Sequence, residues 1–167
     1  YQFVTIHPFL DGNGRLGRIL IILYLISVQK LKYPCLNLSY YLKRNQGEYY
    51  ARLNYIRFSD DYFGWINFFL RGVLISAEEA IAAIKKIMVL REKNFKKIPP
   101  RQQWLLTFLE KNPIINARKT SELTGINYHA VNRTINKYVE LHILLTSDES
   151  KKNRTYIYQE YIDILKE

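Results

Sequence analysis

The sequence predicts a mainly helical protein in two parts, with one small β-hairpin near its C-terminus. Apolar residues recur at helical spacing through 15–32 and 62–95. A charged segment that ends in two prolines, 96–100, then interrupts this pattern. Two short runs of β-branched and aromatic residues follow at 142–146 and 154–158, and such runs are typical of strands.

The proline pair Pro99 and Pro100 marks the predicted domain boundary, because proline does not continue a helix and favours an extended connection. We therefore expect a first domain at 1–95, a linker at 96–100 and a second domain at 101–167. The chain carries 25 basic and 15 acidic side chains, and most of this excess lies in its first half. A net charge of +10 favours anionic partners such as nucleotides, nucleic acid or acidic protein surfaces, without choosing among them.

Cysteine content and hydropathy indicate a cytoplasmic protein with no membrane partner. Cys35 is the single cysteine, which excludes a disulfide within the chain and fits a reducing compartment; we expect it to be buried and inert. The apolar run 19–28 is too short to span a bilayer, so we expect a buried core helix there. The first residues do not resemble a signal peptide, since no basic start precedes an apolar stretch.

The helices expected in the first domain cover 15–32, 39–45, 49–58 and 62–95. Pro34 stops the first of them, and Ser39 is the expected N-cap of the second. Gly47 permits a break before the third helix. Gly72 is the expected weak point of the long fourth helix, because glycine lowers helix stability.

The helices expected in the second domain cover 102–110, 117–123 and 127–141. Thr124 and Gly125 supply the turn between the last two helices. The two strand-forming runs are joined by the polar stretch 147–153 and are expected to pair as a hairpin. Three helices followed by a hairpin describe a winged helix-turn-helix domain.

A glycine-rich segment, HPFLDGNGRLGR at 7–18, carries residue types suited to phosphate chemistry. Gly12 and Gly14 let successive backbone amides approach one anion, and the helix that follows directs its positive dipole end to the same place. Arg15 and Arg18 lie one helical turn apart, where both guanidinium groups can bind phosphate oxygens. This combination predicts a phosphate-binding loop.

Two further residues of the segment supply the chemistry that a phosphotransfer site needs. Asp11 is a hard carboxylate of the kind that holds Mg²⁺ together with nucleotide oxygens. Histidine is the usual general base among side chains, so His7 can accept a proton from an attacking hydroxyl. Each signal alone is weak, since a lone Gly-Asn-Gly is usually an ordinary turn and a lone His beside Pro is usually structural.

The complete segment resembles the signature of the Fic family: His-Pro-Phe, any residue, Asp or Glu, Gly-Asn-Gly-Arg, any two residues, Arg. Every defined position matches. The resemblance implies a protein adenylyltransferase in which His7 deprotonates a Ser, Thr or Tyr hydroxyl on a target protein. That hydroxyl then attacks the α-phosphate of ATP and expels pyrophosphate, with Asp11 binding Mg²⁺.

The resemblance also implies a set of nucleotide-binding residues and a fold. The set comprises Phe9, Gly12, Asn13, Gly14, Arg15, Leu16, Gly17, Arg18, Tyr49 and Arg57. Phe9 is implied to anchor the loop in the core, and Tyr49 and Arg57 to help wall the nucleotide base; Tyr49 equally suits a core position with a wetted hydroxyl. The fold implied for 1–95 is the C-terminal portion of a Fic helical bundle, without the family's upstream helices and target-docking flap, and a homodimer is expected.

The second domain carries side chains that suit DNA binding or protein docking. Asn132, Arg133 and Lys137 on the third helix, with Lys151 and Lys152 on the wing, suit DNA binding. The weak net charge of this domain suits protein docking or dimerisation equally well. Three alternatives to AMP transfer therefore stay open: a DNA-binding regulator with the Fic half as nucleotide sensor, transfer of another phosphate-containing group, and removal of AMP.

Overall fold

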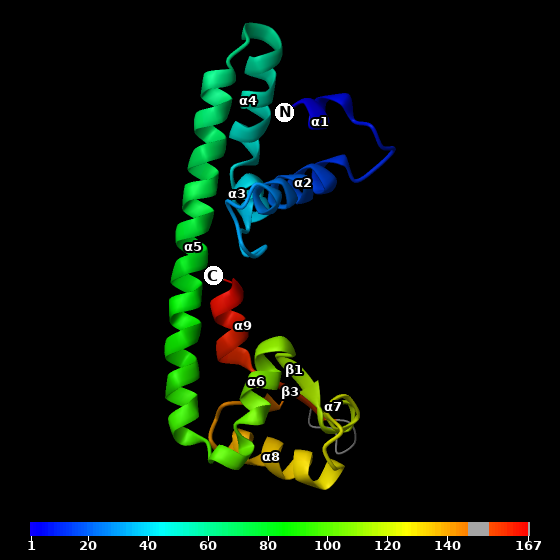
Figure 1. Ribbon diagram of the computed structural model, residues 1–167, viewed down its shortest axis with the longest axis vertical. Coiled ribbons are helices and arrows are strands. Elements are labelled where there is room, and N and C mark those ends of the chain that lie inside the picture. The colour runs from blue at the N-terminus through cyan, green and yellow to red at the C-terminus, as the bar shows by residue number, and fades with distance from the viewer. Residues whose placement is uncertain (147–153, 167) are drawn as a thin grey trace. The chain divides into compact units, whose positions relative to one another are not determined.

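The computed structural model describes residues 1–146 and 154–166, and it confirms a mainly helical fold with a small antiparallel sheet (Figure 1). Contacts divide the chain into two compact units, Tyr1–Ala82 and Ala83–Glu167. The division lies inside helix α5 (Tyr62–Lys97), upstream of the linker predicted at 96–100, because Leu90 is already buried in the core of the second unit. The assignment of the two parts to a Fic portion and a winged-helix domain stays a prediction.

The first unit holds α1 (Gln2–Ile6), α2 (Asn13–Ser27), α3 (Leu38–Arg44), α4 (Gln46–Ser59) and the first part of α5. Helix α2 is shorter than the predicted 15–32 helix. It ends at Ser27 because Gln29 takes a left-handed φ of 58°, and the amides of Lys30 and Leu31 both turn back to the Leu25 carbonyl. Asn37, and not Ser39, precedes the first turn of α3.

The junction between α3 and α4 lies at Asn45, so the break expected at Gly47 is wrong. Asn45 ends α3 and begins α4 with a φ of −108° and a ψ of 34°. Its side-chain amide donates a 2.9 Å hydrogen bond to the Tyr41 carbonyl, which also accepts from the Asn45 backbone amide at 3.0 Å, so Asn45 is bound twice to the end of α3. Gly47 lies within the first turn of α4.

Helix α5 runs unbroken through Gly72, where a weak point was predicted. A Cβ at this position would lie 2.6 Å from the ring of Tyr41 on α3. Glycine is therefore needed for the close approach of the two helices, and this packing offsets its poor helix propensity. Leu38, Tyr41 and Leu42 of α3 pack with Phe68 of α5 as the buried core of the unit.

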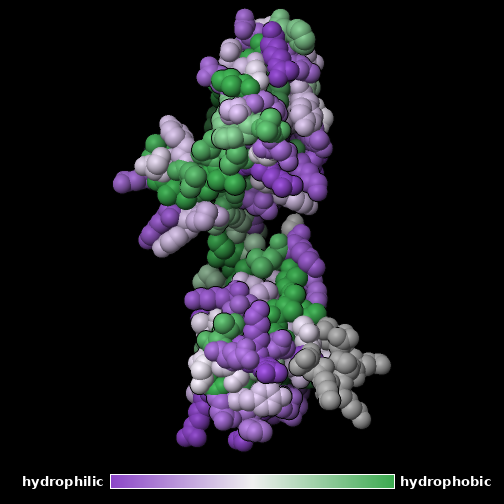
Figure 2. Space-filling view, turned by 90° about the vertical axis from the view of Figure 1, so that its right-hand side faces the viewer, coloured by the Kyte–Doolittle hydropathy of each residue, from purple (hydrophilic) through white to green (hydrophobic). Residues whose placement is uncertain are grey.

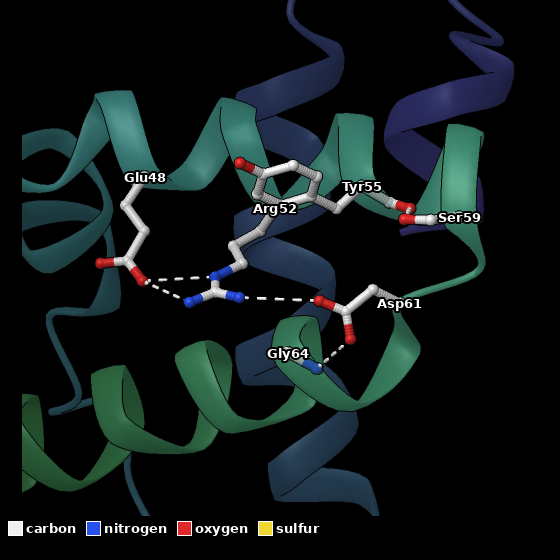
Figure 3. Close-up of polar contacts among 6 residues, drawn as sticks. All are labelled: Glu48, Arg52, Tyr55, Ser59, Asp61 and Gly64. Atoms are coloured by element: carbon white, nitrogen blue, oxygen red, sulfur yellow. Dashed lines mark hydrogen bonds and ion pairs between the residues drawn. The ribbon is translucent and has the colours of Figure 1, made fainter.

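Polar contacts fix the turn between α4 and α5 (Figure 3). Arg52 forms ion pairs with Glu48 one turn earlier, at 3.2 Å, and with Asp61 at 3.6 Å. The Asp61 carboxylate accepts a 2.8 Å hydrogen bond from the Gly64 amide, which caps the start of α5. Figure 1 shows the consequence: α4 runs back alongside the first turns of α5.

Two predictions of burial in the first unit are wrong. Cys35 is exposed, and the 19–28 helix is not a buried core helix, since Ile19 and Leu23 are each 54% exposed. The space-filling view shows hydrophobic residues at the surface of this unit (Figure 2). Among the described helices, none is both long and apolar enough to cross a bilayer.

The second unit holds the end of α5, a 3-10 turn (Pro100–Gln102), α6 (Trp104–Lys111), β1 (Ile114–Asn116), α7 (Ala117–Thr124), α8 (Tyr128–Glu140), β2 (Leu145–Thr146), β3 (Thr155–Ile157) and α9 (Gln159–Lys166). The three predicted helices and the two predicted strands are confirmed. The strands β2 and β3 pair antiparallel, and β1 adds to the other edge of β3 to give the order β1-β3-β2. Strand β1 and helix α9 were not predicted.

The core of the second unit forms where α6 and α8 meet. Leu105, Leu106 and Leu109 of α6 and Val131, Ile135 and Tyr138 of α8 are completely buried. Asn94 on α5 donates a 2.8 Å hydrogen bond to the Tyr158 hydroxyl, and both side chains are buried. Burial is the main cause that raises the pKa of Tyr158 to about 12.

Candidate functional site

Residues 7–12 form a loop between α1 and α2, so the glycine-rich segment is neither continuous helix nor strand. Helix α1 ends at His7, which takes left-handed dihedrals of φ 50° and ψ 59°. The chain turns into α2 at Gly12, whose φ of 79° is a conformation that favours glycine. The loop therefore delivers the chain directly to a helix N-terminus, as predicted.

Asn13 holds this loop closed. Its side chain is 3% exposed and makes two hydrogen bonds to the backbone of Phe9. The amide nitrogen donates to the Phe9 carbonyl at 2.6 Å, and the amide oxygen accepts from the Phe9 N–H at 3.0 Å. Asn13 therefore fixes the shape of the loop through the backbone of Phe9. The predicted contact between Asn13 and a nucleotide stays a prediction.

The first turn of α2 presents backbone amides beside the loop. The first intrahelical hydrogen bond joins the Leu16 amide to the Gly12 carbonyl at 2.9 Å. The amides of Asn13, Gly14 and Arg15 precede that bond and have no acceptor within the helix. Together with the positive end of the helix dipole, these amides form a site that suits one phosphate group.

The His7 imidazole is exposed, and its Nδ1 atom forms a hydrogen bond with the Val4 carbonyl. A carbonyl can only accept, so the neutral ring carries its proton on Nδ1. The Nε2 lone pair is then available to accept a proton from another molecule. The imidazole is not turned into packed hydrocarbon, and its geometry suits a general base.

Asp11 and Arg15 lie on the exposed side of the loop. One Asp11 carboxylate oxygen accepts a 2.6 Å hydrogen bond from the Gly12 amide, and a carboxylate has a second oxygen to offer a metal. Among the described residues, no group of three or more His, Cys, Asp or Glu side chains gathers as a metal site. The donor set therefore fits Mg²⁺ bound through one carboxylate with phosphate oxygens and water, and does not fit an all-protein metal site.

An open, mostly apolar cavity of about 460 Å³ adjoins the first turns of α2. Gly14 and Arg18 are among its lining residues from α2, and Tyr49, Trp65 and Phe69 supply aromatic walls from α4 and α5. The Tyr49 and Trp65 rings lie 5.7 Å apart, and the Trp65 and Phe69 rings stack at 6.4 Å. The cavity thus joins a guanidinium group to flat aromatic surfaces.

Tyr49 is held in this cavity with its hydroxyl protonated. Burial, followed by the neighbouring Tyr50, raises the pKa of Tyr49, and the positive charge of Arg18 partly opposes that increase. The ring contacts the aromatic core through Trp65 and also lines the cavity. The position of Tyr49 therefore suits both predicted roles, a wall for the nucleotide base and a core aromatic residue.

The predicted site residues fall into two groups. Gly14, Gly17, Arg18 and Tyr49 line the cavity, whereas the lining does not include His7, Phe9, Asp11, Gly12, Asn13, Arg15, Leu16 or Arg57. Phe9 is 54% exposed, and its ring lies 6.4 Å from the Phe3 ring between centroids, in a tilted arrangement. Its predicted anchoring in the core is therefore wrong for this chain. Gly17 faces α1, where an added Cβ would lie 3.3 Å from the Phe3 ring.

The cavity also has aromatic walls that sequence reasoning missed. Trp65 and Phe69 were predicted only as part of a helix that packs into a bundle, and Tyr1, Phe3 and Tyr24 were not assigned a site. The signal was present for the first pair, because residues four apart on a helix share one face. Without a known partner for that face, the spacing alone does not distinguish a core position from a ligand wall.

A second, polar cavity of about 240 Å³ lies in the second unit, where α7, α8 and β3 meet. Its lining includes Asn132 and Asn136 of α8 and the arginines Arg118 and Arg154. Of the predicted DNA-binding residues, only Asn132 lines it: Arg133 is exposed elsewhere on α8 and Lys137 pairs with Glu140 at 3.0 Å. The predicted residues Lys151 and Lys152 lie outside the described residues.

Comparison with known proteins supports one family for the N-terminal segment. Residues 1–25 match the Fic/DOC family. A Fido domain-containing protein from Dictyostelium discoideum is 67% identical over 27 residues, which are 16% of this chain and 19% of that relative. The chain therefore aligns with about a fifth of the relative's length. Both matches support Fic family membership through the segment that carries the loop.

Proposed function

We propose that this chain carries the catalytic loop of a Fic-type transferase, and that it transfers AMP from ATP to a Ser, Thr or Tyr hydroxyl of a target protein or of itself. Fic family membership supports a transferase in general. The observation that carries the finer proposal is that one six-residue loop, 7–12, begins at His7, whose Nε2 does not carry the ring proton, and ends at the amides that begin α2. A base and an anion site in one loop are the two parts that acyl- or phosphoryl-type transfer to a hydroxyl requires.

The reaction proceeds as one displacement at the α-phosphorus. Nε2 of His7 accepts the hydroxyl proton while the hydroxyl oxygen attacks the α-phosphate. The bond between the α-phosphorus and the bridging oxygen of pyrophosphate breaks, and pyrophosphate leaves with its electron pair. The α2 amides at Gly14 and Arg15 donate to the phosphate oxygens, and the Arg15 and Arg18 guanidinium groups neutralise the charge of the leaving group.

Asp11 is the residue that would hold Mg²⁺ in this site, through the carboxylate that also accepts from the Gly12 amide. Bound Mg²⁺ would neutralise negative charge on the nucleotide phosphates. Asp11 therefore orients the nucleotide rather than taking part in proton transfer. A cytoplasmic location, where ATP and Mg²⁺ are both available, belongs to the same proposal.

The cavity beside Arg18 is the proposed place for the nucleoside. Aromatic rings of Tyr49, Trp65 and Phe69 offer flat surfaces on which a base can stack, a contact worth about 1–3 kcal/mol per base. Arg18 and Gly14 both line the cavity, so this surface is continuous with the first turns of α2, where the phosphate-binding amides lie. Arg57 is exposed on the last turn of α4 and does not line the cavity, so we give it no direct part in base binding.

A His7→Ala variant tests the proposal. The wild-type chain, incubated with ATP labelled on the α-phosphate, Mg²⁺ and a cell extract, is expected to label protein hydroxyls or itself. His7→Ala is expected to lose at least a hundredfold of this rate, because positioned general bases contribute about 10²–10⁴-fold. The exposed His142→Ala serves as the matched control and is expected to keep the wild-type rate. Undiminished labelling by His7→Ala would remove His7 from its role.

Transfer of another phosphate-containing group, or removal of AMP, uses the same loop and is separated by its products. Mass spectrometry of the modified protein after incubation with a panel of nucleotides distinguishes the reactions. A mass increase of one AMP supports the proposal, an increase of one phosphate contradicts it, and loss of AMP from a modified protein indicates the reverse reaction.

A second candidate function rests on the polar cavity of the second unit. The order of α6, α7, α8 and the β2–β3 pair supports a winged helix-turn-helix domain, in which α8 would enter the major groove. The Arg118, Asn132 and Arg154 side chains around this cavity suit phosphate and base-edge contacts. The Fic half would then act as the nucleotide sensor of a DNA-binding regulator.

Fluorescence anisotropy with labelled duplex DNA tests this second function at several salt concentrations. If α8 binds DNA, Asn132→Ala weakens binding to a preferred sequence by about 1–3 kcal/mol. Arg118→Ala weakens binding to all sequences and lowers the salt slope by about one. No binding at low salt excludes the DNA-binding function and favours a protein-docking role. Equal binding by both variants and the wild type excludes Asn132 and Arg118 as the residues that contact DNA.

A further inference from the structure

Helix α5 carries a stripe of apolar side chains that nothing in the described part of the first unit covers. Its members are spaced three, four or seven residues apart, a pattern that keeps them on one face of a helix. They are exposed as follows: Phe63 78%, Ile66 50%, Leu70 58%, Leu74 59% and Ile81 53%. We call these five residues the α5 stripe.

The α5 stripe is distinct from the face with which α5 packs in its own unit. Phe68, Gly72 and Ser76 are buried and share the face that meets α3. A helix that is apolar on one face needs only one neighbour, whereas α5 has two apolar faces and a neighbour for one of them. The stripe also follows the three-and-four spacing that is typical of helices that pair side by side.

We propose that the α5 stripe is a self-association surface, on which α5 of a second copy packs antiparallel. If the two-fold axis lies close to Ile75 and Ser76, Leu74 of one copy lies level with Ala77 of the other. Leu70 then lies level with Ile81 of the second copy, so that each of the two layers pairs a leucine with another apolar residue. These two layers use only residues of the first unit, whereas Ile66 and Phe63 lie level with Lys85 and Met88, further along α5.

Charges that flank the stripe select the antiparallel orientation. Arg71 and Glu78 are both exposed and lie on the same side of the stripe, seven residues apart. In the antiparallel register, Arg71 of each copy lies within one helical turn of Glu78 of the other, which gives two opposite-charge pairs. In a parallel, in-register pair, the same side chains would lie beside uncharged residues, Val73 and Ala80.

The exposed area is of the size that a specific dimer needs. Five large apolar side chains that are half exposed or more present roughly 500–600 Å² per copy, and the flanking polar residues add to this. Specific interfaces bury about 800 Å² on each partner. The stripe therefore supports a dimer at the lower end of the usual size range, with an affinity that depends on concentration.

Sedimentation equilibrium of the complete chain tests the proposal over about 1 µM to 1 mM. The apparent mass is expected to rise from one chain, 19.9 kDa, to a plateau at two. Leu74→Glu should weaken association at least tenfold, while Phe58→Glu, at an 86% exposed position on α4, should not. A monomer at every concentration, or growth beyond two copies, would overturn the proposal.

Exchange of the charges at Arg71 and Glu78 tests the antiparallel orientation of the two helices separately from non-specific hydrophobic association. Neither side chain belongs to the buried core. Arg71→Glu and Glu78→Arg should each weaken the dimer, because each creates like-charge pairs across the two-fold axis. The double variant should restore the wild-type dissociation constant. Failure of the double variant to recover, with helix content unchanged by circular dichroism, would overturn the antiparallel arrangement.

Discussion

Replacement of Asn13 by alanine is expected to open the 7–12 loop without unfolding the chain. Alanine removes both hydrogen bonds to Phe9, the 2.6 Å bond to its carbonyl and the 3.0 Å bond from its amide. Each bond is worth about 0.5–1.5 kcal/mol net, so the loop should lose about 1–3 kcal/mol. The lower half of that range is more realistic here, because Phe9 is half exposed and water can replace the lost partner.

Hydrogen exchange of the Phe9 amide measures this loss directly. Because about 1.4 kcal/mol corresponds to a factor of ten, a loss of about 1–2 kcal/mol should lower the protection of this amide about 5- to 30-fold in Asn13→Ala. Amides in the middle of α4 should keep their protection. Asn13→Asp is the matched control, because it keeps an acceptor for the Phe9 N–H and loses the donor, so its protection should be intermediate. Unchanged protection of the Phe9 amide in Asn13→Ala would refute the role of Asn13 in holding the loop closed.

Three further predictions concern stability. Gly72→Ala should destabilise the chain by about 1–3 kcal/mol in urea, because the added Cβ would lie 2.6 Å from the Tyr41 ring, whereas a solvent-facing glycine would gain about 1 kcal/mol from the same change. Leu109→Ala should cost about 2–5 kcal/mol, since Leu109 is fully buried; a cost below 1 kcal/mol would contradict the packed core. The pKa of Tyr158 is raised from 10.0 to about 12, so the folded state holds its proton longer than the unfolded state. The contribution of Tyr158 to the free energy of unfolding should therefore be fully present below pH 10. It should fall by about 2 kcal/mol as the pH rises to about 12, and Tyr158→Phe should reduce this fall.

Helices with strong apolar spacing, and the loop with its glycines, could be predicted from the sequence. The helices α6, α7 and α8 and the strands β2 and β3 appear near their predicted positions because local pattern and tertiary packing agree there. The loop was predictable because Gly12 and Asn13 act locally: one supplies a left-handed turn, and the other bonds to a residue four positions earlier.

What the sequence did not reveal depends on partners distant in the chain. From the sequence alone, Gly72 is predicted to weaken the helix, and its packing role becomes evident only from the Tyr41 ring that lies against it. Strand β1 has only three residues and exists because Ile115 pairs with Tyr156. Burial was overestimated for α2, since an apolar run indicates a face that seeks a partner and does not indicate that the partner lies in the same unit. The aromatic walls of the larger cavity were missed for the same reason.

The central claim is that the α2 amides bind phosphate next to the proton-accepting nitrogen of His7. An NMR titration of the ¹⁵N-labelled chain with ATP and Mg²⁺ tests it most directly. We expect the largest amide shifts at Gly12, Gly14 and Arg15, and a His7 ring whose neutral form is protonated at Nδ1. Shifts confined to other parts of the chain, or a neutral His7 ring protonated at Nε2, would contradict the claim.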